Sequence, residues 1–205
     1  MDEKELHDWF TSLKDELETA YIRSREPWKQ SGYLGSEEQW IAARKPVADC
    51  IEKSGSFLDI GCANGYLLEC AVKWTSERNL KIIPYGIDIS EKLIGLAKER
   101  LPEYAHNLYI ANGWNWENPR KFDYVRTELV YVPENLQKRY LERIINTYMK
   151  EGGKLLVAEY GLSSRPPNTS YIGNLLIAWG YNVIDWKSGF YEGKEHTRVY
   201  EIIKS

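Results

Sequence analysis

Apolar and polar residues follow one another along this chain with two different periods, one typical of helices and one typical of strands. Close to the N-terminus, apolar side chains recur at helical spacing and acids stand in the first turn, which predicts an amphipathic helix. Its apolar positions are Leu6, Trp9, Phe10, Leu13, Leu17 and Tyr21. The pattern stops near Pro27, and the abundance of turn-forming residues over 24–36 indicates a loop.

A second helix is predicted after this loop, because Trp40, Ala43, Val47 and Ile51 lie on one helical face. Pro46 falls inside this pattern, and we expect it to kink or restart the helix. From residue 57 onward, short apolar runs alternate with further helical patterns. The runs that predict strands are residues 57–61, 81–88, 107–113, 122–129, 154–161, 181–187 and 196–204.

Helical patterns lie between most of these runs. They predict a helix at about 65–78, one that Ser90 caps, one that Pro133 opens and Gly152-Gly153 ends, and one at about 169–179. Strands that alternate with helices build a parallel sheet covered on both faces, and the last two strands form an antiparallel hairpin. The sequence therefore predicts an α/β fold with a doubly wound, mostly parallel, seven-stranded sheet. We expect a single domain over 1–205, with an N-terminal helical extension at 1–54 as a cap and a core at 55–205.

Composition narrows the class of protein. The chain has 205 residues, of which 43% are hydrophobic and 28% are charged, as in ordinary globular domains. Its formal net charge is −3 and it has no long basic run, so we expect no nucleic-acid partner. No apolar run reaches membrane-spanning length, and the acidic N-terminus lacks the apolar core of a secretory signal.

Cysteines and histidines add two expectations. The three cysteines form no CxxC pair, which favours a reducing compartment and predicts a cytoplasmic protein. The three histidines are scattered and share no ligand spacing with the cysteines, so no metal site is expected. The oligomeric state is left open.

The stretch FLDIGCANGYLLE, residues 57–69, carries the clearest chemical signal. A strand with an acid inside it, Asp59, meets a turn of small residues, and a helix follows. Gly61 and Gly65 permit positive φ angles and let a ligand lie against the backbone, although a plain tight turn would need the same residues. Asp88 ends the second strand roughly 20 residues later, where an acid can bind ribose hydroxyls. Together these features predict a nucleoside site.

The turn argues against NAD as that nucleoside. The dinucleotide fingerprint is GxGxxG, and counting from Gly61 its later glycine positions hold Ala63 and Tyr66. Tyr66 is too large for the close helix–strand packing required at the third position. The carboxylate of Asp59 would repel a phosphate and suits a ligand that carries an ammonium group. A dehydrogenase stays as a minor alternative.

At these residues the chain resembles the class I S-adenosylmethionine-dependent methyltransferases. The match is LDIGCANG with GIDIS, in a resemblance that spans residues 57 to about 201, and Ala63 replaces the middle glycine of the family's motif. The resemblance implies a Rossmann-like fold and S-adenosyl-L-methionine as cofactor. It implies that Asp59 orients the amino group, Asp88 takes the ribose hydroxyls and Ile89 packs on the adenine. The other cofactor-binding positions it implies are Gly61, Cys62, Ala63, Asn64, Gly65, Asn112, Gly113 and Trp114.

The stretch after the third strand departs from the family's pattern. Members often have an acid there to read the adenine amino group, and this chain has Ala111-Asn112-Gly113-Trp114. We expect the side-chain carbonyl of Asn112 and the backbone N–H of Trp114 to take that part. Simple packing is the alternative for Trp114 and for Trp116.

Charged residues in two strands that should be apolar point to a substrate pocket. Buried charges are costly unless they are paired. The predicted pocket, at the carboxyl ends of the fourth and fifth strands, consists of Arg126, Glu128, Tyr131, Glu159 and Tyr160. A purely structural Arg126–Glu159 pair is the alternative. Glu128 and Tyr131 are the candidate catalytic groups, needed as a base only if the acceptor atom carries a proton.

The loop between the first two helices is the candidate lid. We expect Glu26–Ser36 to close over the cofactor with Trp28 and Tyr33 as substrate-side contacts. The alternative is that Trp28 only anchors static helices.

The function expected from these features is transfer of a methyl group to a small-molecule acceptor. No Asp-Pro-Pro-Tyr-type motif follows the fourth strand, which disfavours amine methylation on nucleic acid. Methylation of a protein or RNA, and a non-catalytic S-adenosylmethionine-binding protein, are the alternatives. The acceptor atom is left open.

Overall fold

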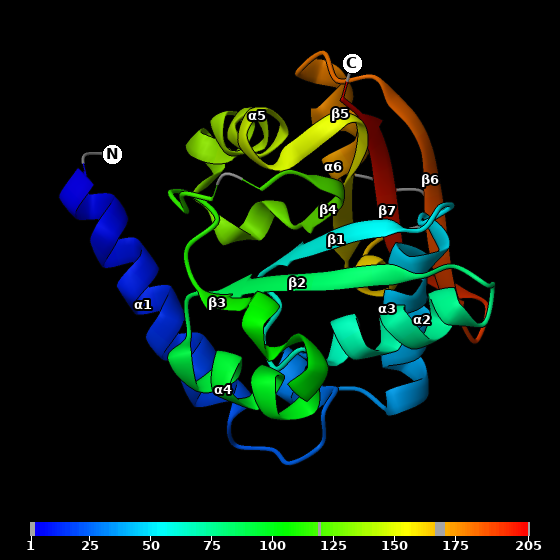
Figure 1. Ribbon diagram of the computed structural model, residues 1–205. Helices are drawn as coiled ribbons and strands as arrows, with labels where there is room; N and C mark the ends of the chain where they lie inside the picture. Colours follow the sequence, from blue (N-terminus) through cyan, green and yellow to red (C-terminus); the bar gives the residue numbers. More distant parts are fainter. Residues whose placement is uncertain (1–2, 119, 167–170, 205) are drawn as a thin grey trace.

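Seven strands form one sheet in the part of the chain that the computed structural model describes, residues 3–118, 120–166 and 171–204. The strands are β1 (Gly55–Ile60), β2 (Ile82–Asp88), β3 (Leu108–Ile110), β4 (Phe122–Thr127), β5 (Met149–Tyr160), β6 (Val183–Tyr191) and β7 (Lys194–Ile203). Their order is β3-β2-β1-β4-β5-β7-β6, and β7 is antiparallel to both of its neighbours (Figure 1). The predicted mostly parallel sheet with a closing hairpin is confirmed.

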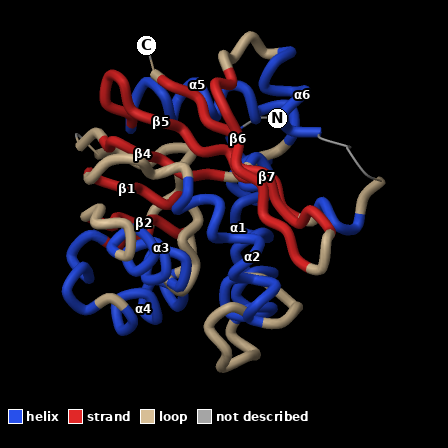
Figure 2. The backbone as a smooth tube through the Cα atoms, turned by 90° about the vertical axis from the view of Figure 1, so that its right-hand side faces the viewer, coloured by secondary structure: helices blue, strands red, loops and turns tan. Residues whose placement is uncertain are grey.

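Helices cover both faces of this sheet. They are α1 (Glu3–Tyr21), α2 (Glu37–Asp49), α3 (Tyr66–Ser76), α4 (Glu91–Arg100), α5 (Gln137–Tyr148) and α6 (Tyr171–Ala178). One core cluster joins α2, α3 and α4 to one face, and a second joins α5 and α6 to the other, so the helices form two layers around the sheet (Figure 2). Alternate strand residues supply the two clusters, as Phe57 and Leu58 do in β1.

The first helix belongs to neither layer. No residue of α1 is fully buried, and the helix runs beside the edge of the sheet where β1 and β2 end (Figure 1). By contrast, α2 is an integral part of the first core cluster, since Trp40 and Val47 are completely buried. Ser36 caps α2 with a full capping box, in which its side chain accepts from the backbone of Gln39 and the Gln39 side chain accepts in return.

The chain order places a switch point at the middle of the sheet. From β1 the chain moves outward to β2 and β3, and it then returns to the other side of β1 with β4. The loops after β1 and β4 therefore diverge and leave a crevice at the carboxyl ends of these strands, where open α/β sheets bind their ligands.

Two helix boundaries differ from those expected. α5 ends at Tyr148, because Met149 already has an extended backbone and starts β5. The expectation that Gly152-Gly153 ends this helix is wrong. The glycines lie inside β5, where the pairing with β4 slips, and a Cβ on Gly153 would lie 2.9 Å from the carbonyl oxygen of Lys150. The expectation for Pro46 is a kink or a restart of α2, and the helix runs through this residue, so it does not restart there.

Smaller differences concern element ends. β3 has only the residues Leu108–Ile110, so 111–113 form a loop instead of a strand end. A short 3-10 turn, Glu134–Leu136, stands between Pro133 and α5. The last predicted helix starts at Tyr171 in the structure, and its first two expected residues lie outside the described ranges. In the described part of the chain, no helix has the length and apolarity needed to cross a bilayer.

The packing of α6 on the sheet gives a stability prediction. Leu176 is completely buried in the second core cluster, whereas its neighbour Ile177 is 66% exposed. We expect Leu176→Ala to lower the free energy of unfolding by about 2–5 kcal/mol, because it removes buried methyl groups and leaves a cavity. Ile177→Ala, the matched control, should change it by less than about 0.5 kcal/mol. Urea unfolding measures both, and equal losses would contradict the described orientation of α6.

Candidate functional site

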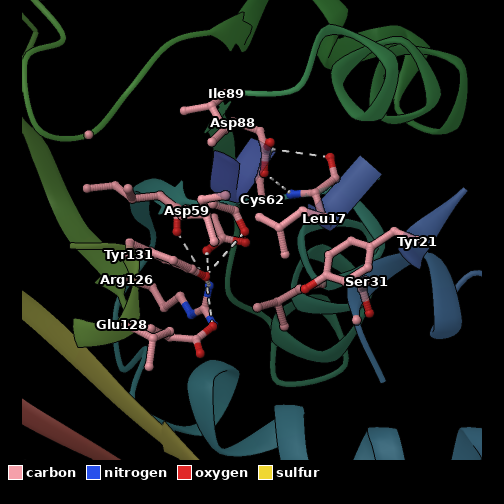
Figure 3. Close-up of a pocket in the computed structure, with 18 of the residues that line it drawn as sticks. Leu17, Tyr21, Ser31, Asp59, Cys62, Asp88, Ile89, Arg126, Glu128 and Tyr131 are labelled. Atoms are coloured by element: carbon pink, nitrogen blue, oxygen red, sulfur yellow. Dashed lines mark hydrogen bonds and ion pairs between the residues drawn. The ribbon is translucent and has the colours of Figure 1, made fainter. Parts of the chain in front are cut away.

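A cavity of about 520 Å³ lies at the carboxyl ends of the parallel strands (Figure 3). Its volume is within the range of small-molecule sites, roughly 300–1,000 Å³. Residues at the carboxyl ends of β1 to β5 or in the loops after them line it on the sheet side. They include Asp59, Gly61, Cys62, Ala63, Asp88, Ile89, Asn112, Gly113, Arg126, Glu128, Tyr131 and Tyr160. Most of the predicted site residues therefore share one cavity.

The turn after β1 presents its backbone to this cavity. Gly61 has a φ of 75° and Ala63 a φ of 47°, so both residues adopt the left-handed region. The ring of Tyr131 lies against Gly61, and a Cβ at that position would meet a ring atom at 2.5 Å. Only glycine fits between the turn and this ring, which explains why small residues stand here.

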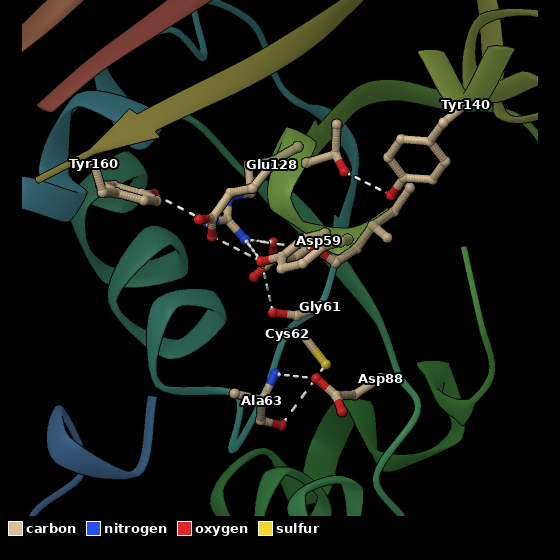
Figure 4. Close-up of polar contacts among 12 residues, drawn as sticks. Asp59, Gly61, Cys62, Ala63, Asp88, Glu128, Tyr140 and Tyr160 are labelled. Carbon is tan, nitrogen blue, oxygen red and sulfur yellow. Dashed lines mark hydrogen bonds and ion pairs between the residues drawn. The ribbon is translucent and has the colours of Figure 1, made fainter. Parts of the chain in front are cut away.

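Asp88 lies at the end of β2 and faces the cavity beside this turn (Figure 4). One carboxylate oxygen accepts a hydrogen bond from the backbone N–H of Ala63 at 3.0 Å, and the other accepts from the N–H of Ser90 at 2.9 Å. Burial raises the pKa of Asp88 to about 6, although these two backbone hydrogen bonds favour the ionised form. The carboxylate is thus fixed in place and can accept further hydrogen bonds from a ligand.

Arg126 is the centre of the polar contacts in the cavity floor. It is 3% exposed, and β1 and β4 pair Asp59 directly with Arg126, so the two side chains lie on the same face of the sheet. The Nη1 atom of Arg126 donates to Oδ1 of Asp59 at 3.0 Å, and Nη2 forms an ion pair with Glu128 (Figure 4). Burial raises the pKa of Asp59, and the Arg126 charge opposes part of that rise.

Two tyrosines complete this cluster. Arg126 donates to the hydroxyl of Tyr131 at 3.0 Å and to that of Tyr160 at 3.1 Å. The Tyr131 hydroxyl in turn donates to Glu128 at 2.7 Å. Burial raises the pKa of Tyr131, so its phenol keeps its proton near neutral pH. Between the two candidate catalytic groups, Tyr131 therefore donates the hydrogen bond and Glu128 accepts it.

Glu159 does not join this pocket. Consecutive strand residues point to opposite faces of a sheet, and Tyr160 takes the cavity face. The Glu159 side chain lies on the other face, where it accepts from Arg165, from the Tyr200 hydroxyl and from the backbone N–H of Tyr171. The structural alternative, an Arg126–Glu159 pair, is not formed either, since Arg126 pairs with Asp59 and Glu128.

The residues after β3 are arranged differently from the expected adenine contacts. The side-chain carbonyl of Asn112 accepts from the backbone N–H of Trp114 at 2.9 Å, so the two groups expected to bind adenine bind each other. Asn112 and Gly113 line the cavity, and Trp114 packs in the second core cluster instead. The Trp116 ring packs on Tyr148, which fits the packing alternative.

The turn residues Asn64 and Gly65 are not among the residues that line the cavity. Asn64 is fully buried, and its side-chain amide donates to the carbonyl of Pro27 at 3.0 Å and to Gln30 at 3.2 Å. Asn64 therefore ties the glycine turn to the loop over 24–36. In that loop Tyr33 lines the cavity, whereas Trp28 packs on the first core cluster and donates its indole N–H to the carbonyl of Gly35.

The N-terminal helices supply cavity residues that sequence reasoning did not assign. The apolar stripe of α1 contributes Phe10, Leu13, Leu17 and Tyr21, and α2 contributes Trp40 and Arg44. The α1 stripe was visible in the sequence, but periodicity alone does not tell whether such a stripe meets a core or a cavity. Glu18 holds the end of α1 in place, since it accepts from the Ser90 hydroxyl at 2.7 Å and pairs with Lys92.

Comparisons with known proteins agree with this geometry. A family model described as a methyltransferase domain matches residues 51–176. No curated protein matches the chain.

Solved structures share the fold at low sequence identity. A 1,6-didemethyltoxoflavin-N1-methyltransferase from Burkholderia thailandensis has a TM-score of 0.71 at 14% identity, over 98% of this chain and 90% of its own. Magnesium protoporphyrin IX methyltransferase from Synechocystis PCC 6803, solved with bound S-adenosylmethionine, has a TM-score of 0.64 at 16% identity, over 96% and 97%. A ribosomal protein methylase from Lactobacillus delbrueckii subsp. bulgaricus has a TM-score of 0.57 at 15% identity, over 84% and 81%.

The fit between Gly61 and Tyr131 gives a testable prediction. Gly61→Ala places a side chain at a positive φ and forces the Tyr131 ring to move, so we expect a loss of about 1–3 kcal/mol in the free energy of unfolding. Gly95→Ala in α4 is the control, because a Cβ there meets nothing within 4 Å. It should stabilise the helix by about 0.5–1 kcal/mol. Thermal unfolding of the two variants decides, and a neutral Gly61→Ala would contradict the described turn.

Proposed function

The protein belongs to the methyltransferase-domain family, because the family model covers more than half of the chain. We propose that it transfers a methyl group from S-adenosylmethionine to a small-molecule acceptor. The observation that carries the proposal is the shared cavity of the left-handed Gly61–Ala63 turn and the Asp88 carboxylate. The first gives a ligand access to backbone, and the second suits ribose hydroxyls.

The residues on the sheet side fit the cofactor. Asp88 has both oxygens held by backbone N–H groups and faces the cavity, so it is preorganised to accept from two hydroxyls. Ile89, next to it, offers an apolar contact for the adenine. The Asp59 carboxylate faces the region where the ammonium group of the methionine end would be held. The bound cofactor supplies an activated methyl group on a positively charged sulfonium.

The chain's own residues then orient the acceptor and exclude water. Positioning of two reactants can contribute roughly 7–11 kcal/mol to lowering a barrier, so few reactive side chains are required. The apolar residues of α1 cover the side of the cavity opposite the sheet and keep water from the reacting groups.

Glu128 is the residue to which we assign a proton-accepting role when the acceptor atom carries a proton. Its carboxylate lines the cavity, and its side chain is 19% exposed, so an acceptor can reach it. Tyr131 donates to the same carboxylate and fixes its position. Burial raises the pKa of Tyr131, so we assign it the role of positioning Glu128 and not that of removing a proton from the acceptor.

The N-terminal cover over part of the cavity supports a small acceptor. α1, Tyr33 and Arg44 line it on the side away from the sheet, which leaves little room for a protein or RNA surface. Similar folds in a toxoflavin and a protoporphyrin methyltransferase agree with a small acceptor, whereas the ribosomal protein methylase favours a protein acceptor as the second candidate.

An acceptor screen tests the proposal directly. The purified chain is incubated with S-adenosylmethionine carrying a labelled methyl group and either a metabolite extract or the matching protein fraction. We propose that a mass of metabolite size gains the label. Label found only on protein would move the acceptor to the second candidate, and label on neither would contradict methyl transfer.

The raised pKa of Asp88 gives a pH prediction. Ribose hydroxyls donate more strongly to the ionised carboxylate than to the protonated one, so the cofactor complex lowers the pKa of Asp88 below its free value of about 6. Below about pH 6 the Asp88 carboxyl of the free protein is mostly protonated, and cofactor binding must release that proton. The affinity for S-adenosylhomocysteine should therefore be constant above pH 7 and fall by up to about tenfold per pH unit below 6.

Calorimetry between pH 5 and pH 8 measures this dependence. Asp88→Asn should bind more weakly and lose the dependence, because it has no proton to release. A wild-type affinity that is flat over this range would contradict the assignment of Asp88 to the ribose, and tight binding of NAD in place of S-adenosylhomocysteine would contradict the cofactor.

The roles of Glu128 and Tyr131 can be separated kinetically with the acceptor from the screen. Glu128→Gln keeps the shape but removes the base, and for a protonated acceptor we expect kcat to fall by about 10²–10⁴. Tyr131→Phe keeps the base and removes only its positioning hydroxyl, so its loss should be smaller. A larger loss in Tyr131→Phe than in Glu128→Gln would reverse the two roles.

A further inference from the structure

Arg44 is a buried cation in the cavity wall that the glycine turn and the proton-accepting cluster do not use. It lies in α2, whose other inward residues are apolar, and it is 9% exposed. Its Nη1 atom is buried and has no hydrogen-bond partner in the described part of the chain. Arg44 also lines the cavity, so its side chain borders the space that a ligand would occupy, while Nη1 itself is enclosed.

The other arginine of the cavity is already neutralised. Arg126 pairs with Asp59 and Glu128, whereas Arg44 takes part in no ion pair among the described residues. A guanidinium stays charged at any pH that a protein tolerates, so Arg44 cannot avoid the cost of burial by losing its proton. A buried cation is stable only when an anion or several acceptors meet it. The cavity side is where such a partner fits.

Two tyrosines hold the plane of Arg44 without using its N–H edge. The guanidinium carbon lies 3.5 Å from the centre of the Tyr160 ring and 5.7 Å from that of Tyr33. Contacts of this kind engage the face of a guanidinium and leave its donors in the plane free. The stacking therefore orients the guanidinium but gives its N–H donors no hydrogen-bond acceptor. An oriented fork of N–H donors matches a carboxylate, which it can bind with two parallel hydrogen bonds.

We propose that Arg44 binds a carboxylate inside the cavity. The inference rests on the proposed function, and within it the carboxylate comes from one of two sources, the methionine end of the cofactor or the acceptor molecule. Asp59, Asp88 and Glu128 make the remaining polar wall acidic, so Arg44 decides where an anionic group can lie. In either case the residue selects ligands that carry a negative charge at that end.

Two adenosine probes separate the sources. S-adenosylhomocysteine has the amino-acid carboxylate, and 5′-methylthioadenosine lacks it, while both keep the nucleoside. Their affinities are measured by calorimetry for the wild-type chain, for Arg44→Met, which keeps an apolar stem, and for Arg44→Lys, which keeps the charge. Lys45→Met is the matched control, because it removes the same charge from the adjacent, exposed position of α2. Thermal unfolding shows that each variant is folded.

A contact with the cofactor predicts that Arg44→Met weakens binding of S-adenosylhomocysteine at least about tenfold and leaves 5′-methylthioadenosine unchanged, with Arg44→Lys in between. A contact with the acceptor predicts that both adenosine probes bind as in the wild type. In that case benzoate, titrated into the S-adenosylhomocysteine complex, should bind better than benzamide, and Arg44→Met should remove the preference.

The proposal is overturned if Arg44→Met weakens both adenosine probes equally, or if it changes neither and the wild-type complex does not prefer benzoate to benzamide. Binding of the two adenosine probes by the wild-type chain tests the proposed function. The difference between the probes in Arg44→Met tests the inference, so the two can fail separately.

Discussion

The buried ion pair between Asp59 and Arg126 is the interaction on which the cavity floor depends. Each charge would be costly in the interior alone, and the parallel register of β1 and β4 places them side by side so that each meets the other. The two terminal nitrogens of Arg126 also bind Glu128, Tyr131 and Tyr160. These contacts link the ends of β1, β4 and β5. The Tyr131 ring, held in this way, lies on the Gly61 turn and sets how closely a ligand can approach it.

The wall opposite this floor is built on a different principle. α1 has no fully buried residue, and most of its apolar stripe lines the cavity, while Phe10 also packs against the second core cluster. Polar contacts of Glu18 with Ser90 and Lys92 help to hold α1 in place. Apolar surface that borders a cavity gains most of its burial only when the cavity is filled. A bound ligand therefore adds to the stability of this wall, whereas the floor is stabilised by contacts within the protein.

Charge in the cavity is distributed unevenly between its two arginines. Arg126 is surrounded by acids and phenols and serves to order them, so it presents little net charge to a ligand. Arg44 is stacked on Tyr160 and forms no ion pair with a carboxylate among the described residues. Tyr160 contacts both arginines, one through its hydroxyl and the other through its ring face. A single side chain therefore links the ordered polar floor to the unpaired cation in the wall.

The sequence by itself determined the strand and helix order, the glycine turn and the place of Asp88, because these depend on local spacing and on the residues that tight turns accept. The sequence could also have predicted that Glu159 and Tyr160 lie on opposite faces of the sheet, because neighbouring strand residues alternate between the two faces. Tertiary structure alone decided that Asp59 is the partner of Arg126, that Asn112 binds Trp114, and that the α1 stripe and Arg44 line the cavity. Periodicity fixes the face on which a side chain lies. Its partner depends on strand order and helix placement, which bring together residues far apart in the chain.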